Sequence, residues 1–128
     1  MQYEATIKYL RVSTRKVRLV TDAVKKLPVQ RALAELSMMP KHASELLEKA
    51  IKSAIANAKQ KNANIETLRI ERIEVMGGPM MKRFHAVSRG MAHSYKKRMT
   101  HVRVILTDET IPSAVKKIKD KTVKGGKR

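Results

Sequence analysis

The sequence predicts an α+β protein in which three helices pack on a small three-stranded antiparallel sheet, with a long protruding β-hairpin arm. An alternating, strand-like segment opens the chain at residues 3–12, and apolar residues at helical spacing follow it up to residue 62. Two further alternating segments, residues 65–76 and 100–107, flank a stretch that has neither period. Because only this stretch joins them, the two segments most simply pair as antiparallel strands.

The N-terminal part of the chain predicts one strand and one helix. In YEATIKYLRV, residues 3–12, alternation places three side chains on one face: Ala5, Ile7 and Tyr9. Ser13 is suited to a helix N-cap, because its hydroxyl can accept a hydrogen bond from the first turn. One apolar stripe follows at Val17, Val20, Val24 and Leu27, and Pro28 should end this helix.

Two more helices are predicted before residue 65. The first covers VQRALAELSMM, residues 29–39, and its buried side should hold Val29, Ala32, Leu33 and Leu36. The second covers residues 41–62 and repeats apolar residues at positions 43, 46, 47, 50, 51, 54, 55 and 58. Alanine occupies four of these eight positions, so this helix can lie very close to its packing partner. Residues 62–64 should end it.

The next two strands complete the sheet. In residues 65–76 the inward side chains should be Leu68, Ile70, Ile73 and Val75. Their alternation shifts by one residue near Glu71 and Arg72, which a β-bulge would explain. Residues 100–107 should point Val102, Val104 and Leu106 inward. We expect residues 1–107 to form one domain and residues 108–128 a frayed basic extension.

The stretch MGGPMMKRFHAVSRGMAHSYKKRMTH, residues 76–101, predicts the arm. It has no Asp or Glu and carries six cations: Lys82, Arg83, Arg89, Lys96, Lys97 and Arg98. An unpatterned loop of this length is uncommon unless it has its own function. We interpret it as a ribbon at about 77–100 that turns near residues 88–91, where Gly90 gives backbone freedom. About a dozen residues per side would reach on the order of 40 Å.

The composition favours a polyanionic partner. The formal net charge is +18, with 29 Lys and Arg against 11 Asp and Glu, and an isolated two-stranded ribbon of like charges is marginal in water. Nucleic acid is the first candidate. An anionic membrane surface is the second, but it would favour stronger segregation of apolar and basic residues.

The chain has no cysteine, which excludes disulfides and thiolate metal sites. It shows neither a signal-peptide pattern nor a membrane span, so we expect a soluble intracellular protein.

Arg15, Lys16 and Arg18 lie at the predicted start of the first helix, where the helix dipole disfavours cations. A phosphate would reverse this sign, because a helix N-terminus with basic side chains attracts anions in two ways. With Arg11 just before them, we interpret these residues as phosphate contacts. The alternative is a solvated basic face.

Three separated motifs carry a family resemblance. They are RVSTRKVRLV at residues 11–20, SAIANAKQKN at 53–62, and GPMMKRF at 78–84 followed by KKRMTHVRVIL at 96–106. Together they resemble the bacterial type of the large-subunit ribosomal protein twenty-two family, over about residues 5–107. The resemblance implies a structural, non-enzymatic component of the cytoplasmic large ribosomal subunit that needs no cofactor, with an organellar ribosome as the alternative location. It also implies a hairpin that reaches through ribosomal RNA to line the nascent-peptide tunnel.

The partners implied are large-subunit ribosomal RNA, whose assembly the protein would aid, neighbouring ribosomal proteins and the nascent polypeptide chain, with no homo-oligomer. The residues that match the family's RNA contacts are Ser13, Arg15, Lys16, Arg18, Lys82, Arg83, Lys97, Arg98 and His101. To these the charge pattern adds Arg11, Arg89 and Lys96. The tunnel-lining tip would be His85, Ala86, Val87, Ser88, Arg89, Gly90, Met91, Ala92 and His93. The family's tip is usually richer in arginine, and Gly77 stands where the family commonly has an acidic residue.

Other functions are not favoured. His85, His93 and His101 recur every eight residues, but that spacing on a strand is about 26 Å, so we expect no metal site and suggest protonation beside phosphates instead. We recognise no nucleophile–base pair. Four aromatic residues are too few for a base-stacking platform. The alternative function is an architectural DNA-binding protein, although such proteins normally dimerise and insert an apolar wedge.

Overall fold

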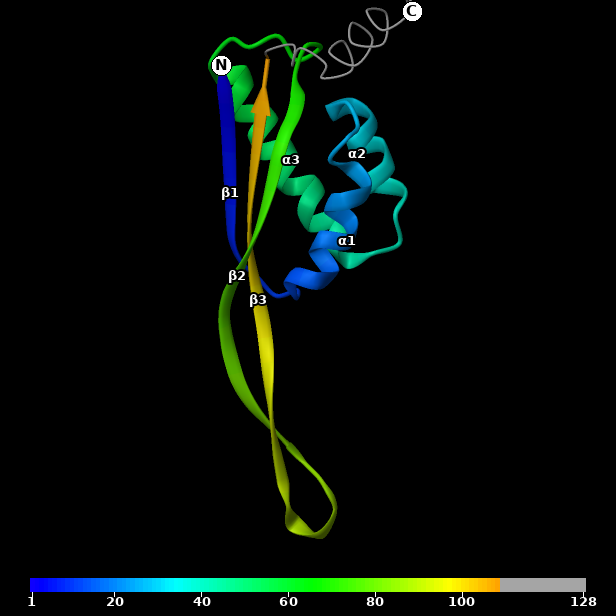
Figure 1. Cartoon of the computed structure of the whole chain (residues 1–128), viewed down its shortest axis with the longest axis vertical. Helices are drawn as coiled ribbons and strands as arrows, with labels where there is room; N and C mark the ends of the chain where they lie inside the picture. Colours follow the sequence, from blue (N-terminus) through cyan, green and yellow to red (C-terminus); the bar gives the residue numbers. More distant parts are fainter. Residues whose placement is uncertain (109–128) are drawn as a thin grey trace, which may run out of the picture.

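The computed structural model describes residues 1–108, in which a three-stranded sheet packs against three helices and continues into a hairpin arm (Figure 1). The strands are β1 (Gln2–Leu10), β2 (Arg69–Ala86) and β3 (Ala92–Thr107), in the order β1-β3-β2, and both pairs are antiparallel. The helices are α1 (Thr14–Val24), α2 (Val29–Met38) and α3 (His42–Gln60). The predicted fold class is confirmed. Residues 109–128, most of the predicted basic extension, lie outside the described residues.

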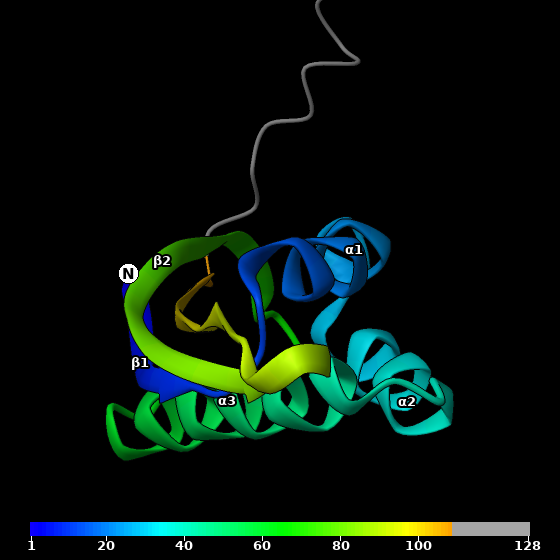
Figure 2. The same ribbon diagram turned by 90° about the horizontal axis from the view of Figure 1, so that it is seen from below.

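The core lies between the sheet and the helices. From β3, Val102, Val104 and Leu106 are fully buried, as the alternation predicts. The long helix α3 lies along the sheet (Figure 2), and Ala50 and Ala54 in its middle are completely buried. The alanines therefore allow the close packing that the sequence indicates. None of the helices within residues 1–108 is long and apolar enough to cross a membrane.

Two local predictions in the middle of the chain are confirmed: the β-bulge in β2 and the end of the long helix near residue 62. The ladder between β2 and β3 shifts register between Ile70 and Arg72, where the sequence indicates a bulge. After α3, Asn62 adopts a left-handed backbone with φ of 57°, which asparagine tolerates better than most residues at a helix end. The side chain of Asn57 also donates a 2.9 Å hydrogen bond to the backbone oxygen of Glu4, which ties α3 to the edge strand β1.

Three element ends differ from the prediction. Tyr9 is not on the inner face: a register shift between Ile7 and Leu10 gives it a φ of 60° and leaves it 61% exposed. The shift turns the chain out of the sheet toward α1. The helix α1 ends at Val24, before Pro28, and Leu27 lies partly buried in the connection. Strand β2 begins at residue 69 rather than 65. The chain first forms a turn, in which the hydroxyl of Thr67 donates a hydrogen bond to the backbone carbonyl of residue 64.

Strands β2 and β3 continue as a pair well beyond β1 and form the arm (Figure 1). Their pairing is unbroken from Met80–Arg98 to Ala86–Ala92, and a short 3-10 turn, Ser88–Gly90, closes the ribbon. Arg89 and Gly90 have positive φ values of 60° and 68°. The predicted turn is therefore confirmed. Every residue from 82 to 98 is exposed, so no face of the outer ribbon packs on the rest of the described protein.

The arm leaves the sheet at a second register shift, between Gly77 and Met80. Here the two strands approach closely: a Cβ atom at Gly78 would lie 3.1 Å from the backbone carbonyl carbon of Met99. A Cβ atom at Gly77 would meet nothing within 4 Å. The two neighbouring glycines thus differ in whether a side chain fits.

We predict that Gly78→Ala lowers the free energy of unfolding by about 1 kcal/mol, because the backbone of β3 has to move to admit the methyl group. Gly77→Ala is the matched control and should change stability by no more than about 0.5 kcal/mol. Chemical denaturation of the full chain measures both. Equal destabilisation by the two substitutions would contradict the close approach as its cause.

Candidate nucleic-acid interface

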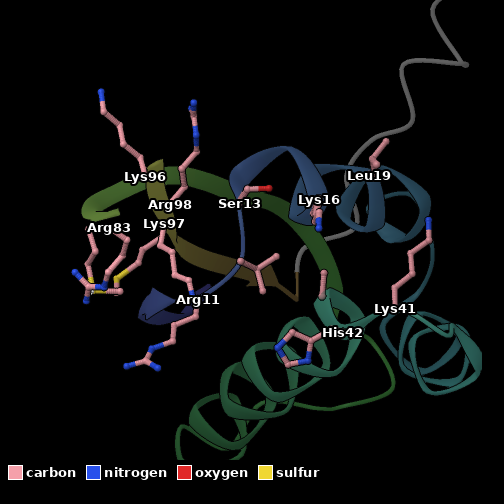
Figure 3. Close-up of a pocket in the computed structure, with 14 residues that line it drawn as sticks. Arg11, Ser13, Lys16, Leu19, Lys41, His42, Arg83, Lys96, Lys97 and Arg98 are labelled. Atoms are coloured by element: carbon pink, nitrogen blue, oxygen red, sulfur yellow. Dashed lines mark hydrogen bonds between the residues drawn. The ribbon is translucent and has the colours of Figure 1, made fainter. Parts of the chain in front are cut away.

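A concave surface lies where the arm meets the starts of α1 and α3 (Figure 3), and we call it the junction groove. Its volume is about 950 Å³. Four chain segments line it: Arg11, Val12, Ser13, Lys16 and Leu19; Lys41, His42 and Ala43; Met81 and Arg83 of β2; and Lys96, Lys97, Arg98 and Met99 of β3. The lining includes seven Lys and Arg side chains and no acidic residue, so the groove suits an anion.

The register of the arm sorts its cations onto two faces, because directly paired residues of antiparallel strands point to the same side. One face has Lys82 opposite Lys96, with Arg98 two residues along; the other has Arg83 and Lys97. Figure 3 shows Lys96 and Arg98 on one side of the ribbon and Arg83 on the other. Like charges directly opposite one another destabilise a strand pair. An external anion beside the Lys82–Lys96 pair would therefore stabilise the arm.

The start of α1 has no counter-charge among the described residues. Ser13 occupies the predicted N-cap position with an extended backbone, φ −73° and ψ 146°, but its hydroxyl makes no capping hydrogen bond. The expected capping bond is therefore wrong; Ser13 faces the junction groove instead. The first turn of α1 has no acidic residue. A helix start of this kind attracts an anion through its backbone N–H groups and its dipole.

The start of α3 adds two cationic or titratable side chains, Lys41 and His42, that the sequence reasoning missed. The available signal was a basic pair at the start of the clearest predicted helix. Glu45 is the acidic residue in this first turn, but Lys49 donates it a 2.8 Å hydrogen bond. That bond lowers the pKa of Glu45, so the carboxylate stays ionised and paired with Lys49 at neutral pH. The same carboxylate lies 4.0 Å from Nδ1 of His42, so Lys41 is the side chain that keeps this part of the groove cationic.

A family model for ribosomal protein L22p/L17e matches residues 5–107 of the chain, which include the sheet, all three helices and the arm. The chain belongs to this family. The resemblance drawn from the three motifs is confirmed, and membership makes the chain a structural ribosomal protein rather than an enzyme.

Several relatives, each named large ribosomal subunit protein uL22, are similar over most of both chains. The protein of Caldicellulosiruptor saccharolyticus is 43% identical over 105 residues, which cover 81% of this chain and 86% of the relative. That of Chloroflexus aggregans is 42% identical over 111 residues, 86% and 98% of the two chains. That of Brachyspira hyodysenteriae is 40% identical over 126 residues, 97% and 93% of the two chains. The last similarity extends into the C-terminal extension.

The structure brings together seven of the RNA-binding residues predicted for this ribosomal protein. The junction groove gathers Arg11, Ser13, Lys16, Arg83, Lys96, Lys97 and Arg98. Five others lie outside it: Arg15, Arg18, Lys82, Arg89 and His101. Of these, Lys82 and Arg89 are exposed on the arm. The predicted tip, residues 85–93, forms the far end of the arm and is exposed throughout.

Arg18 is placed differently from the prediction. Because α1 begins at Thr14, Arg18 lies in the second turn rather than the first. One of its terminal nitrogens, Nη2, donates a 3.3 Å hydrogen bond to the backbone oxygen of Val75 in β2. This contact links Arg18 to the sheet, although its side chain is exposed, as are those of Arg15 and Lys16 in the first turn.

The spacing of the arm histidines differs from the prediction for one pair. His85 and His93 are direct partners across the ribbon, so the predicted separation along a single strand is wrong for them. At the base of the arm, Nδ1 of His101 accepts a 2.9 Å hydrogen bond from the backbone N–H of Tyr9. Nδ1 therefore carries no proton in this arrangement, which leaves Nε2–H as the donor. Within residues 1–108, no three His, Asp or Glu side chains are grouped to hold a metal ion.

Proposed function

We propose that this protein is a structural component of the cytoplasmic large ribosomal subunit that binds large-subunit ribosomal RNA and aids its assembly. Its arm would line the exit tunnel for the nascent polypeptide. The observation that carries this proposal is the arm, whose outer residues, 82–98, are all exposed and include six cations and no acidic side chain. Such a ribbon has no hydrophobic face, and its charges repel one another, so phosphates on both faces would offset its instability.

The proposed contacts divide into two regions. Phosphate and sugar contacts would come from the junction groove and the two cationic faces of the arm, as expected for recognition of folded RNA by shape. The tip, residues 85–93, would reach the tunnel and meet the nascent chain. Neighbouring ribosomal proteins would contact the remaining surface. We further propose that residues 1–107 act as one domain, because the core and the base of the arm share β2 and β3.

The alternative function, an architectural DNA-binding protein, has less support. The cationic arm is the feature that favours DNA binding, and this arm fits RNA equally well. The chain, however, belongs to a ribosomal protein family over residues 5–107. Ribosomal RNA is therefore the polyanion that we propose.

A photoreactive amino acid in place of Val87 tests the position of the tip. In ribosomes that carry a stalled nascent chain, this residue should cross-link to the nascent chain and to large-subunit ribosomal RNA. Met38 provides the control position, because it is 85% exposed on α2 and lies outside the arm. Cross-linking from position 38 to the nascent chain but not from position 87 would contradict the proposed orientation. Absence of the protein from large subunits after sedimentation would contradict the function itself.

A further inference from the structure

The connection from β1 to α1, residues 9–13, determines where two residues of the junction groove lie. It contains Arg11, which lines the groove, and Ser13, at the N-cap position of α1. Figure 1 shows the chain crossing from the end of β1 to α1 at the base of the arm. The connection begins at Tyr9, whose φ of 60° lies in the left-handed region. That region is disfavoured for a residue with a side chain, so neighbouring contacts have to hold Tyr9 there.

Two consecutive residues of β3 hold this connection with their side chains. Nδ1 of His101 accepts a 2.9 Å hydrogen bond from the backbone N–H of Tyr9. The rings of these two residues also meet edge to face, with their centroids 4.9 Å apart. Three residues further along the chain, the backbone oxygen of Val12 accepts a 2.6 Å hydrogen bond from the buried hydroxyl of Thr100. The strand β3 therefore holds the connection at both of its ends.

The hydrogen bond from Tyr9 requires a neutral imidazole. A protonated histidine donates from both ring nitrogens and cannot accept a hydrogen bond. A cationic contact between His101 and a phosphate would therefore remove the bond that holds Tyr9 in its left-handed conformation. The two roles exclude each other, and the geometry favours the acceptor.

We propose that His101 is a positioning residue for the RNA-binding surface. As a neutral acceptor it fixes the connection, so that Arg11 and the start of α1 present their anion-binding groups to ribosomal RNA. The Nε2–H of the same ring is a neutral donor and adds no charge to the surface. This inference depends on the RNA-binding function proposed above.

Two substitutions of His101 separate the possible roles of its side chain. His101→Asn keeps an acceptor in nearly the same place, because Oδ1 of asparagine, like Nδ1 of histidine, is bonded to Cγ. His101→Phe keeps an aromatic ring but has no acceptor. Both variants lack the Nε2–H donor, and neither can become cationic. His101 is partly exposed, so both variants should fold.

Binding of the full chain to a large-subunit ribosomal RNA transcript provides the first measurement. His101→Phe should bind about 3- to 10-fold more weakly than the wild type, the effect of losing one hydrogen bond. His101→Asn should bind within about twofold of the wild type. In hydroxyl-radical footprinting, His101→Phe should lose the protections that Arg15→Gln/Lys16→Gln also loses, because both changes affect the start of α1.

Amide exchange in the free protein, followed by NMR, provides the second measurement. The amide of Tyr9 should exchange slowly in the wild type and in His101→Asn, where an acceptor covers it, and rapidly in His101→Phe. This readout does not depend on RNA, so it tests the hydrogen bond separately from the binding function.

Every other pattern overturns the proposal. Equal weakening of RNA binding by both variants would show that His101 contacts RNA directly, and weakening by His101→Asn alone would show that the ring matters rather than the acceptor. If His101→Phe binds RNA as the wild type does, the bond to Tyr9 does not position the surface. If the wild-type protein itself does not bind the RNA, the RNA-binding function fails and the positioning role fails with it.

Discussion

Removing the arm should make the binding of ribosomal RNA much less sensitive to salt. Replacing residues 80–98 by a short Asn-Gly turn deletes six cations: Lys82, Arg83, Arg89, Lys96, Lys97 and Arg98. If each neutralises one phosphate, the slope of log affinity against log salt should become shallower by about 4 to 5 units. Filter binding at several potassium chloride concentrations measures this slope. A deletion that leaves the slope unchanged would contradict an electrostatic role for the arm.

A neutral arm of the same length separates charge from shape. In this control the same six residues are changed to Gln, which keeps the strand pairing of β2 and β3 possible. We expect it to lose as much of the salt dependence as the deletion, because the counterions are released by charge rather than by the backbone. If the neutral arm instead keeps the wild-type slope, the cations that matter lie outside the arm, with Arg11, Lys16 and Lys41 of the junction groove as the next candidates.

The second large effect is expected at the start of α1. Arg15→Gln/Lys16→Gln removes two cations that oppose the helix dipole, so the free protein should be as stable as before or more stable by a few tenths of a kcal/mol. Binding of ribosomal RNA should weaken by roughly 1.5–3 kcal/mol for each charged hydrogen bond lost. Thermal unfolding and RNA titration measure the two effects. Their opposite signs distinguish a binding site from a solvated basic face.

Arg18 provides the matched control for this experiment. The substitution Arg18→Gln removes one positive charge from the same helix, but it also removes the hydrogen bond to the carbonyl of Val75. Arg18→Gln should therefore lower the free energy of unfolding by up to about 1 kcal/mol. If Arg15→Gln/Lys16→Gln destabilises the protein while its RNA affinity is unchanged, those two residues are structural and the phosphate contacts lie elsewhere.

Local pattern was sufficient for much of the fold. The apolar repeat of α3, the alternation of β3 and the phase change at the β2 bulge are set by neighbouring residues, because a helix or strand buries one face at a fixed period. The hairpin arm followed from a cationic stretch between two strands, and its turn from Gly90. The family, too, was evident from three short motifs.

The failures in the fold are at places where a neighbouring element overrides the local pattern. Tyr9 continues the alternation of β1 in sequence, but the chain has to leave the sheet there to reach α1, and its side chain turns outward. Arg18 was expected in the first turn of α1, yet it lies in the second turn, where the packing of α1 beside β2 brings it to the oxygen of Val75. Neither placement can be predicted from the spacing of nearby residues.

The sequence by itself therefore determined the helices, the strands, the arm and its charge. Only the tertiary structure decided that the starts of α1 and α3 meet the base of the arm in one groove. Lys16, His42 and Lys97 belong to three elements, and their convergence depends on how α1 and α3 pack against the sheet. That packing is set by many long-range side-chain contacts in the core, whereas periodicity reports only which face of each element is buried.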